Sequence, residues 1–166
     1  MSTAIATKTV VTAFDPRVTI RLLEESYGPG AWHGPDLKAA VAGVSPQAAF
    51  WRPGPARHNI AEVAVHHAWC VRSVTAQLSG VAPEPFVLDG EDWFALSDDT
   101  RLGWAEITAL LKDSQHGLAG LLADISAGRV QSPLSNAEQF DLVLGIACHA
   151  VYHAGQVQLI KALGAA

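Results

Sequence analysis

Apolar residues recur at helical spacing in three long segments of this chain, and this pattern constrains its fold more than any other feature. Between residues 60 and 78 they form one stripe with the 3.6-residue period of an α-helix, and similar stripes follow at 100–127 and 136–163. Strand-like runs such as residues 10–12 are too short to compete with them. Because a helix with one apolar face buries that face against a neighbour, the sequence predicts an all-α protein.

Capping residues and glycines bound each predicted helix. Asn59 and Glu62 have the spacing of a capping box at the start of one long helix, and Asp98 and Asp99 are expected to cap the next. Residues 81–99 hold several glycines and prolines, and we expect them to form a long crossover. The predicted helices span residues 16–27, 36–42, 60–79, 100–127 and 136–163.

Four long helices with one long connection favour a four-helix bundle. The length of 166 residues suits one domain with a proper core. We therefore expect a single bundle domain over residues 14–166, preceded by a flexible lead-in over residues 1–13.

The composition argues against several classes of protein. With 49% apolar residues the chain can bury enough surface to fold, and its two cysteines lie too far apart in predicted helices to suggest a disulfide framework. The net charge is −5 and the eleven Lys and Arg residues are scattered, which argues against nucleic-acid binding. Charged residues or histidines interrupt every long apolar run, and the N-terminus lacks a secretory signal. We therefore predict no membrane segment and expect a cytoplasmic location.

Two histidines lie on the apolar face of the last predicted helix. His149 and His153 are one turn apart, so both point the same way. A buried imidazole has a donor and an acceptor to satisfy, and a metal ion would take one nitrogen from each ring. The spacing alone fits two hydrogen-bonded core histidines equally well.

The helix over residues 60–79 offers two candidates for a third ligand. His67 lies in the centre of the apolar stripe, whereas His66 lies toward its edge, one turn before Cys70. Periodicity favours His67 as the inward residue. It does not decide which one binds, because a ligand for a central cavity can lie at the edge of a stripe.

Two motifs together resemble the DinB-like (YfiT-type) superfamily. The segment Asn59–His66 is similar to that family's S-I-x-E-hydrophobic-x-x-H segment, and His149–Gln156 is similar to its H-x3-H-x-G-Q signature. The segments at 32–35 and 52–57 also recur in many members. The order and separation of the motifs match, and the resemblance covers nearly the whole chain.

The resemblance implies an up-down-down-up four-helix bundle, often a homodimer, with one divalent metal ion held by His66, His149 and His153. It selects His66 over His67, which then fills a position that is usually aliphatic. Cys70 stands where relatives tend to carry an aromatic residue; it is either a fourth ligand or a small core residue, and we favour the core interpretation. Three imidazoles suit zinc, nickel, manganese or iron, so the metal stays open.

Three protein ligands leave one coordination position open, which is typical of catalytic metal sites. The resemblance implies a metal-dependent S-transferase that joins a low-molecular-weight thiol to a small electrophilic substrate. One alternative is a hydrolase that uses metal-bound hydroxide. Another is a non-catalytic metal- or small-ligand-binding stress-response protein. The sequence holds neither an H-E-x-x-H motif nor a pair of Glu-x-x-His motifs, so a zinc protease and a di-iron bundle are excluded.

Other polar and aromatic residues have a structural and a functional interpretation. Glu62 could orient His66 or act as a base, although its place in a capping box is the simpler account. Gln156 could hydrogen-bond a bound ligand, or it needs another partner as a core-facing polar residue. Trp32 and His33 either line the mouth of a pocket or cap the end of the bundle. The remaining expectations are packing roles for Trp69 and Tyr152 and solvated side chains for His58 and His116.

Overall fold

The computed structural model describes residues 16–28 and 30–164, and within these ranges it contains six α-helices and no strand. The predicted all-α class is confirmed. The lead-in expected at residues 1–13 lies outside the described residues. The helices are α1 (Pro16–Tyr27), α2 (Leu37–Val41), α3 (Pro46–Phe50), α4 (Ile60–Ser79), α5 (Trp104–Ser126) and α6 (Asn136–Gly164).

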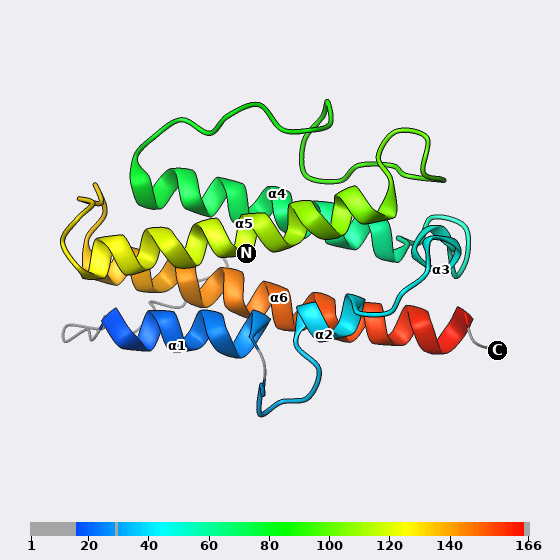
Figure 1. Cartoon of the computed structure of the whole chain (residues 1–166), viewed down its shortest axis with the longest axis horizontal. Helices are drawn as coiled ribbons and strands as arrows, with labels where there is room; N and C mark the ends of the chain where they lie inside the picture. Colours follow the sequence, from blue (N-terminus) through cyan, green and yellow to red (C-terminus); the bar gives the residue numbers. More distant parts are fainter. Residues whose placement is uncertain (1–15, 29, 165–166) are drawn as a thin grey trace, which may run out of the picture.

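Four long helices lie side by side along the length of the molecule (Figure 1). α4 packs against α5 and α6, and α1 packs against the same two helices. The colour gradient in Figure 1 shows that α4 and α5 run in one direction and that α1 and α6 run in the opposite direction. The two parallel helices are joined by the expected long crossover, which returns along α4 to the start of α5.

The start and the end of α4 follow the predicted chemistry. The Asn59 side chain accepts a hydrogen bond from the Glu62 N–H at 2.8 Å, and the Glu62 carboxylate accepts one from the Asn59 N–H at 3.4 Å, which confirms the capping box. Gly80 ends the helix with φ of 69°, a left-handed conformation that favours glycine. A Cβ atom there would also lie 3.0 Å from the ring of Pro133.

The prediction that Asp98 and Asp99 cap the third long helix is wrong, because that helix, α5, begins later, at Trp104. Asp98 instead accepts hydrogen bonds from the backbone and hydroxyl of Thr100, which closes a local turn before the helix. The carboxylate of Glu106 accepts the Gly103 N–H at 2.8 Å and caps α5 from within. An acidic residue before a helix therefore marked a turn here rather than the helix start.

The short helix α3 was not predicted, although its signal is present in the sequence. Ser45 accepts a hydrogen bond from the Ala48 N–H at 3.2 Å, and Pro46 occupies the first helical turn. At five residues the helix is too short to show an apolar period.

α6 departs from one expectation. It contains an 18-residue window with a mean hydropathy of 1.2, so by length and composition alone it could cross a membrane. The expectation that no run is long enough was wrong because two histidines lower the mean hydropathy of so long a helix only slightly. The core helix of a soluble protein passes the same test, and here α6 packs against α1, α2 and α4.

The buried apolar residues form two clusters along the bundle. One contains Ile60, Val65 and Ala154, and the other contains Val71 and Ile146. The histidines of α4 fall between Val65 and Val71, and those of α6 fall between Ile146 and Ala154. The bundle therefore carries a layer of imidazoles where its two apolar clusters meet.

Candidate metal centre

Three imidazole rings from α4 and α6 turn the same nitrogen toward one another. The Nε2 atom of His149 lies 3.1 Å from Nε2 of His66 and 2.9 Å from Nε2 of His153. His66 and His153 are 6% and 2% exposed, and His149 is half-buried. The residues that the resemblance implied as ligands are thus brought together, although whether they bind a metal stays a prediction.

The helices place these rings through spacing and small neighbours. His149 and His153 are one turn apart on α6, and their ring centroids lie 4.2 Å apart. Both helices also carry buried alanines, and small side chains allow neighbouring helices to approach closely because interaxial distance depends on side-chain size. These buried alanines are Ala61, Ala64 and Ala68 on α4 and Ala147, Ala150 and Ala154 on α6.

The outer nitrogens of two rings have hydrogen-bond acceptors. Nδ1 of His66 lies 2.9 Å from the Asp92 carbonyl oxygen and 3.1 Å from its Oδ1, and Nδ1 of His153 lies 2.5 Å from Oε1 of Gln156. Because these oxygens only accept, each Nδ1 carries the proton and each Nε2 presents a lone pair. Metal-binding histidines are oriented in this way. Gln156 therefore has a partner inside the cluster.

The crossover covers the cluster with two residues to which the sequence analysis assigned no role in the site. The Trp93 ring stacks on His66, with centroids 3.9 Å apart, and its other face stacks on His58 at 3.7 Å. Asp92 holds its carbonyl toward His66 in a left-handed conformation, with φ of 62°. No periodicity signals such residues, because they lie in an irregular segment.

The donor set fits a divalent metal ion. Two tetrahedral nitrogen ligands of zinc lie roughly 3.4 Å apart, given Zn–N bonds of about 2.0–2.1 Å, and the Nε2 atoms here lie 2.9 and 3.1 Å apart. The fixed Nδ1 protons of His66 and His153 leave their Nε2 lone pairs close to Nε2 of His149. Imidazole nitrogens of this kind suit zinc, nickel and iron.

Comparison with known proteins assigns the family. The model of the DinB superfamily matches residues 31–157, which is more than half of the chain. The chain belongs to the DinB superfamily. No curated protein and no solved structure matched it. The resemblance drawn from the two histidine motifs is thereby confirmed, and both motifs lie within the matched range.

His67 of this DinB-superfamily protein lies behind His149 rather than beside the other Nε2 atoms. It is fully buried, as periodicity predicted for the inward residue, and its Nδ1 lies 2.9 Å from Nδ1 of His149. Its Nε2 lies 2.6 Å from Nε2 of Gln115 on α5. The sequence analysis missed Gln115, although a polar residue in the stripe of Leu111 and Leu118 was a usable signal.

Cys70 lies next to the cluster, so both interpretations of it stay open. Its Sγ is 3.8 Å from Nε2 of His66, and potential ligand atoms of His66, Cys70 and His149 lie within 4.8 Å of one another. The side chain also packs against the second apolar cluster. Burial, together with the negative charge of Asp92, raises the pKa of the Cys70 thiol to about 11. Without an ion, the residue is therefore a neutral thiol.

Cys70→Ala is expected to change zinc affinity by less than about threefold, because three imidazoles with an open position suffice for a catalytic site. The measurement is competitive zinc titration, with absorption spectra of the cobalt-loaded protein alongside. A thiolate-to-cobalt charge-transfer band that disappears in the variant, with a large loss of affinity, would identify Cys70 as a fourth ligand instead.

Three of the cluster histidines, His67, His149 and His153, are neutral at physiological pH. Burial, and then the neighbouring His66, lowers the pKa of His149 to about 4. Burial, and then His149, lowers the pKa of His153 to about 4 despite the opposing hydrogen bond to Gln156. Burial also lowers the pKa of His67 well below its ordinary value. A neutral ring has one nitrogen with a free lone pair, which binding to a metal ion requires.

The metal-free protein is expected to lose stability as the pH falls from about 6.5 to about 4. In this window the unfolded chain binds protons at His149 and His153 that the folded chain does not bind, so protonation favours unfolding. Above pH 6.5 the rings are neutral in both states and contribute nothing. Urea unfolding at stepped pH measures the effect. A free energy of unfolding that stays level across the window, or a slope unchanged in His149→Leu/His153→Leu, contradicts the assignment.

Glu62 is fully engaged as a structural residue. Among the described residues its carboxylate accepts hydrogen bonds from Arg52 at 2.5 and 2.9 Å, from the Leu96 N–H at 2.9 Å and from the capped Asn59, and it pairs with His58 at 3.1 Å. Burial would raise the pKa of Glu62, but these hydrogen bonds outweigh it and lower the pKa. The capping role favoured from the sequence is therefore observed.

The aromatic and histidine candidates outside the cluster lie at different depths in the structure. Trp32 is 94% exposed and His33 bonds the Glu25 carbonyl, so both lie beside α1 rather than in the cluster. Trp69 packs against the first apolar cluster, as expected. Tyr152, expected to be a packing residue, is exposed, and its hydroxyl accepts a hydrogen bond from Gln156.

His116 is exposed, as predicted. His58 is exposed as well, as predicted, although Trp93 stacks on its ring and Glu62 contacts its Nδ1. The contact with Trp93 follows from the crossover folding back over α4, which no local pattern reveals, whereas His58 and Glu62 are only four residues apart.

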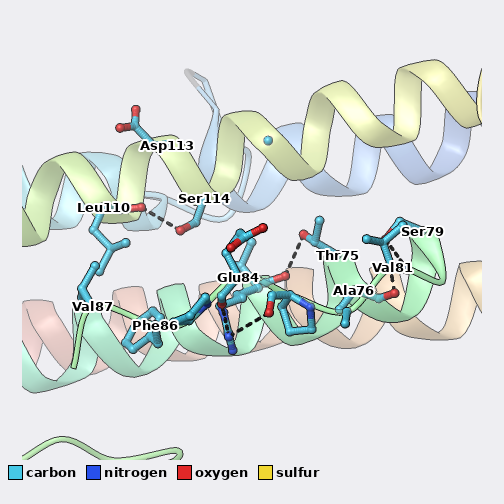
Figure 2. A pocket seen from close by; sticks show the side chains of 16 residues that line it. Thr75, Ala76, Ser79, Val81, Glu84, Phe86, Val87, Leu110, Asp113 and Ser114 are labelled. Carbon is cyan, nitrogen blue, oxygen red and sulfur yellow. Dashed lines mark hydrogen bonds between the residues drawn. The ribbon is translucent and has the colours of Figure 1, made fainter. Parts of the chain in front are cut away.

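A separate cavity of about 380 Å³ lies between the crossover and helices α4 and α5 (Figure 2). Its walls are largely apolar, and Arg72 closes one side by donating a hydrogen bond to the Glu84 carbonyl at 2.7 Å. Neither the four cluster histidines nor their neighbours Trp93 and Gln156 are among the described residues that line it. The cavity therefore lies at the contact of the crossover with α4 and α5 and is separate from the candidate metal centre.

Proposed function

We propose that this DinB-superfamily protein is a metal-dependent S-transferase that joins a low-molecular-weight thiol to a small electrophilic substrate. The convergence of three imidazole Nε2 atoms carries the proposal, with His66, His149 and His153 as the residues that would hold the ion. A divalent ion bound there would lower the pKa of a bound thiol and supply a nucleophile near neutral pH. In the transfer, sulfur bonds to the electrophilic carbon, the leaving group departs with its electron pair, and the thiol proton goes to solvent.

A cavity of about 540 Å³ close to the cluster supports a small substrate, although none of the four cluster histidines is among the described residues that line it. His58 and Gln156 line it, and these residues also contact Trp93 and His153 respectively. The rest of the lining includes the apolar side chains of Leu159, Ile160 and Leu163 and the cationic side chain of Arg57. This lining suits a molecule with an apolar body and an anionic group.

The state of Glu62 favours transfer over hydrolysis. Hydrolysis is served by a carboxylate that can take a proton from water, and Glu62 was the candidate. Its oxygens are occupied by Arg52 and the Leu96 N–H. Asp92, the carboxylate that contacts the cluster, faces Nδ1 of His66.

The test begins with metal analysis of the purified protein, followed by loading with zinc, nickel, manganese or iron(II). Each form is then assayed with several biological thiols against a panel of electrophiles. Turnover that requires both thiol and metal and disappears in His153→Ala supports the proposal; exposed His116→Ala is the matched control and should retain it. Turnover without thiol would favour a hydrolase. Metal binding without any turnover would favour a non-catalytic binding protein.

A further inference from the structure

A buried hydrogen-bonded chain leads from α5 to the back of His149. Gln115 is 2% exposed and His67 is fully buried, so neither is satisfied by bulk water. Nε2 of Gln115 lies 2.6 Å from Nε2 of His67, and Nδ1 of His67 lies 2.9 Å from Nδ1 of His149. Among the described residues, the amide oxygen of Gln115 is a buried side-chain atom without a hydrogen-bond partner. Leaving a buried oxygen without a hydrogen bond is costly, so an arrangement in which this oxygen accepts a hydrogen bond would be favoured.

In this arrangement the positions of the protons follow from the amide nitrogen of Gln115. That nitrogen only donates, so Nε2 of His67 accepts and the proton of His67 resides on Nδ1. His67 then donates to Nδ1 of His149, which puts the proton of His149 on Nε2. That proton points at the lone pairs of His66 and His153, so the chain is self-consistent without an ion. The proton on Nε2 of His149 also blocks the nitrogen that would bind a metal ion.

A half-turn of the Gln115 amide group reverses the direction of each hydrogen bond from Gln115 through His67 to His149. The oxygen then faces Nε2 of His67 and accepts its proton, so Nδ1 of His67 becomes an acceptor. His149 donates from Nδ1 and presents an Nε2 lone pair beside those of His66 and His153. Each ring carries one proton in both arrangements, because the proton lost from Nε2 of His149 is balanced by the one gained at Nε2 of His67.

We propose that Gln115, acting through His67, positions His149 for metal binding by selecting which of its nitrogens carries the proton. Gln115 and His67 are positioning residues in this scheme, not ligands. The inference rests on the proposed metal site and adds a control on it from α5, a helix that supplies no ligand. It also gives the unpartnered amide oxygen a function, as the acceptor in the metal-bound form.

Two substitutions at one position test this scheme. A carboxylate at residue 115 can only accept, so Gln115→Glu is expected to fix the metal-binding arrangement, whereas Gln115→Leu removes both donor and acceptor. In the metal-free proteins at pH 8, ¹⁵N spectra of the histidine rings should show His149 protonated at Nε2 in the wild type and at Nδ1 in Gln115→Glu. Zinc titration should show affinity weakened about 10–100-fold in Gln115→Leu and retained or improved in Gln115→Glu.

The scheme is overturned if His149 has the same proton position in the wild type and in Gln115→Glu, or if both variants lose affinity equally, as a mere packing role predicts. His116→Ala, adjacent on α5 but exposed, is the control and should bind zinc as the wild type does. The spectra need no metal, so they also separate two failures. Absence of zinc uptake by the wild type would sink the proposed function, whereas unchanged proton positions would sink this inference alone.

Discussion

His66→Ala is expected to weaken zinc binding by more than about 100-fold, whereas His67→Ala is expected to weaken it by only about 10–100-fold. The first substitution removes one of the two Nε2 atoms that lie within 3.1 Å of Nε2 of His149. The second removes only the partner of Nδ1 of His149 and leaves all three Nε2 atoms in place. The two residues are adjacent on α4, so the pair compares a ligand with a supporting residue in nearly the same surroundings.

The comparison requires equilibrium zinc titration with a competing chelator, and circular dichroism to show that both variants keep their helices. His153→Ala should match His66→Ala, since its Nε2 lies 2.9 Å from Nε2 of His149 and that of His66 lies 3.1 Å away. If His67→Ala abolished binding while His66→Ala retained it, the ligand assignment would be reversed. Equal losses in the two variants would leave no reason to prefer His66.

Glu62→Ala is expected to destabilise the fold by about 1–3 kcal/mol, because it leaves the buried N–H of Leu96 without its acceptor and removes the partner of the partly exposed Arg52. The Glu62 side chain is 3% exposed, and it holds the guanidinium of Arg52 by two hydrogen bonds. It also accepts the buried N–H of Leu96, whose carbonyl accepts a hydrogen bond from Asn59 at 2.6 Å. The substitution therefore loosens both the start of α4 and the crossover segment that carries Trp93.

Urea unfolding of the metal-free protein measures this loss. Glu138→Ala is a suitable control, because Glu138 forms a similar capping pair with Ser135 but is exposed. A small change is expected there. If the two variants lost stability equally, the cap would account for the effect of Glu62 and the ion pair with Arg52 would contribute little.

Local patterns predicted most helix boundaries. The first helix, the capping box of Asn59 and Glu62, and the glycine stop at residue 80 all appear where expected. The errors share one cause: Asp98 and Ser45 are both suitable caps, and only one of them precedes a helix. Short polar side chains bond the nearest free N–H whether a turn or a helix follows, so the cap alone does not distinguish them.

The sequence by itself determined the helical class, the family and the spacing that puts His149 and His153 on one side of α6, because these depend on contacts within a few residues. It did not decide the roles of His66 and His67. The two residues are adjacent on α4, so the apolar pattern does not separate their roles. Across the interface of α4 and α6, His66 contacts Nε2 of His149, whereas His67 contacts its Nδ1. The parts played by Asp92, Trp93 and Gln115 were likewise settled by tertiary structure, since an irregular crossover and a third helix meet the histidines only after the bundle has packed.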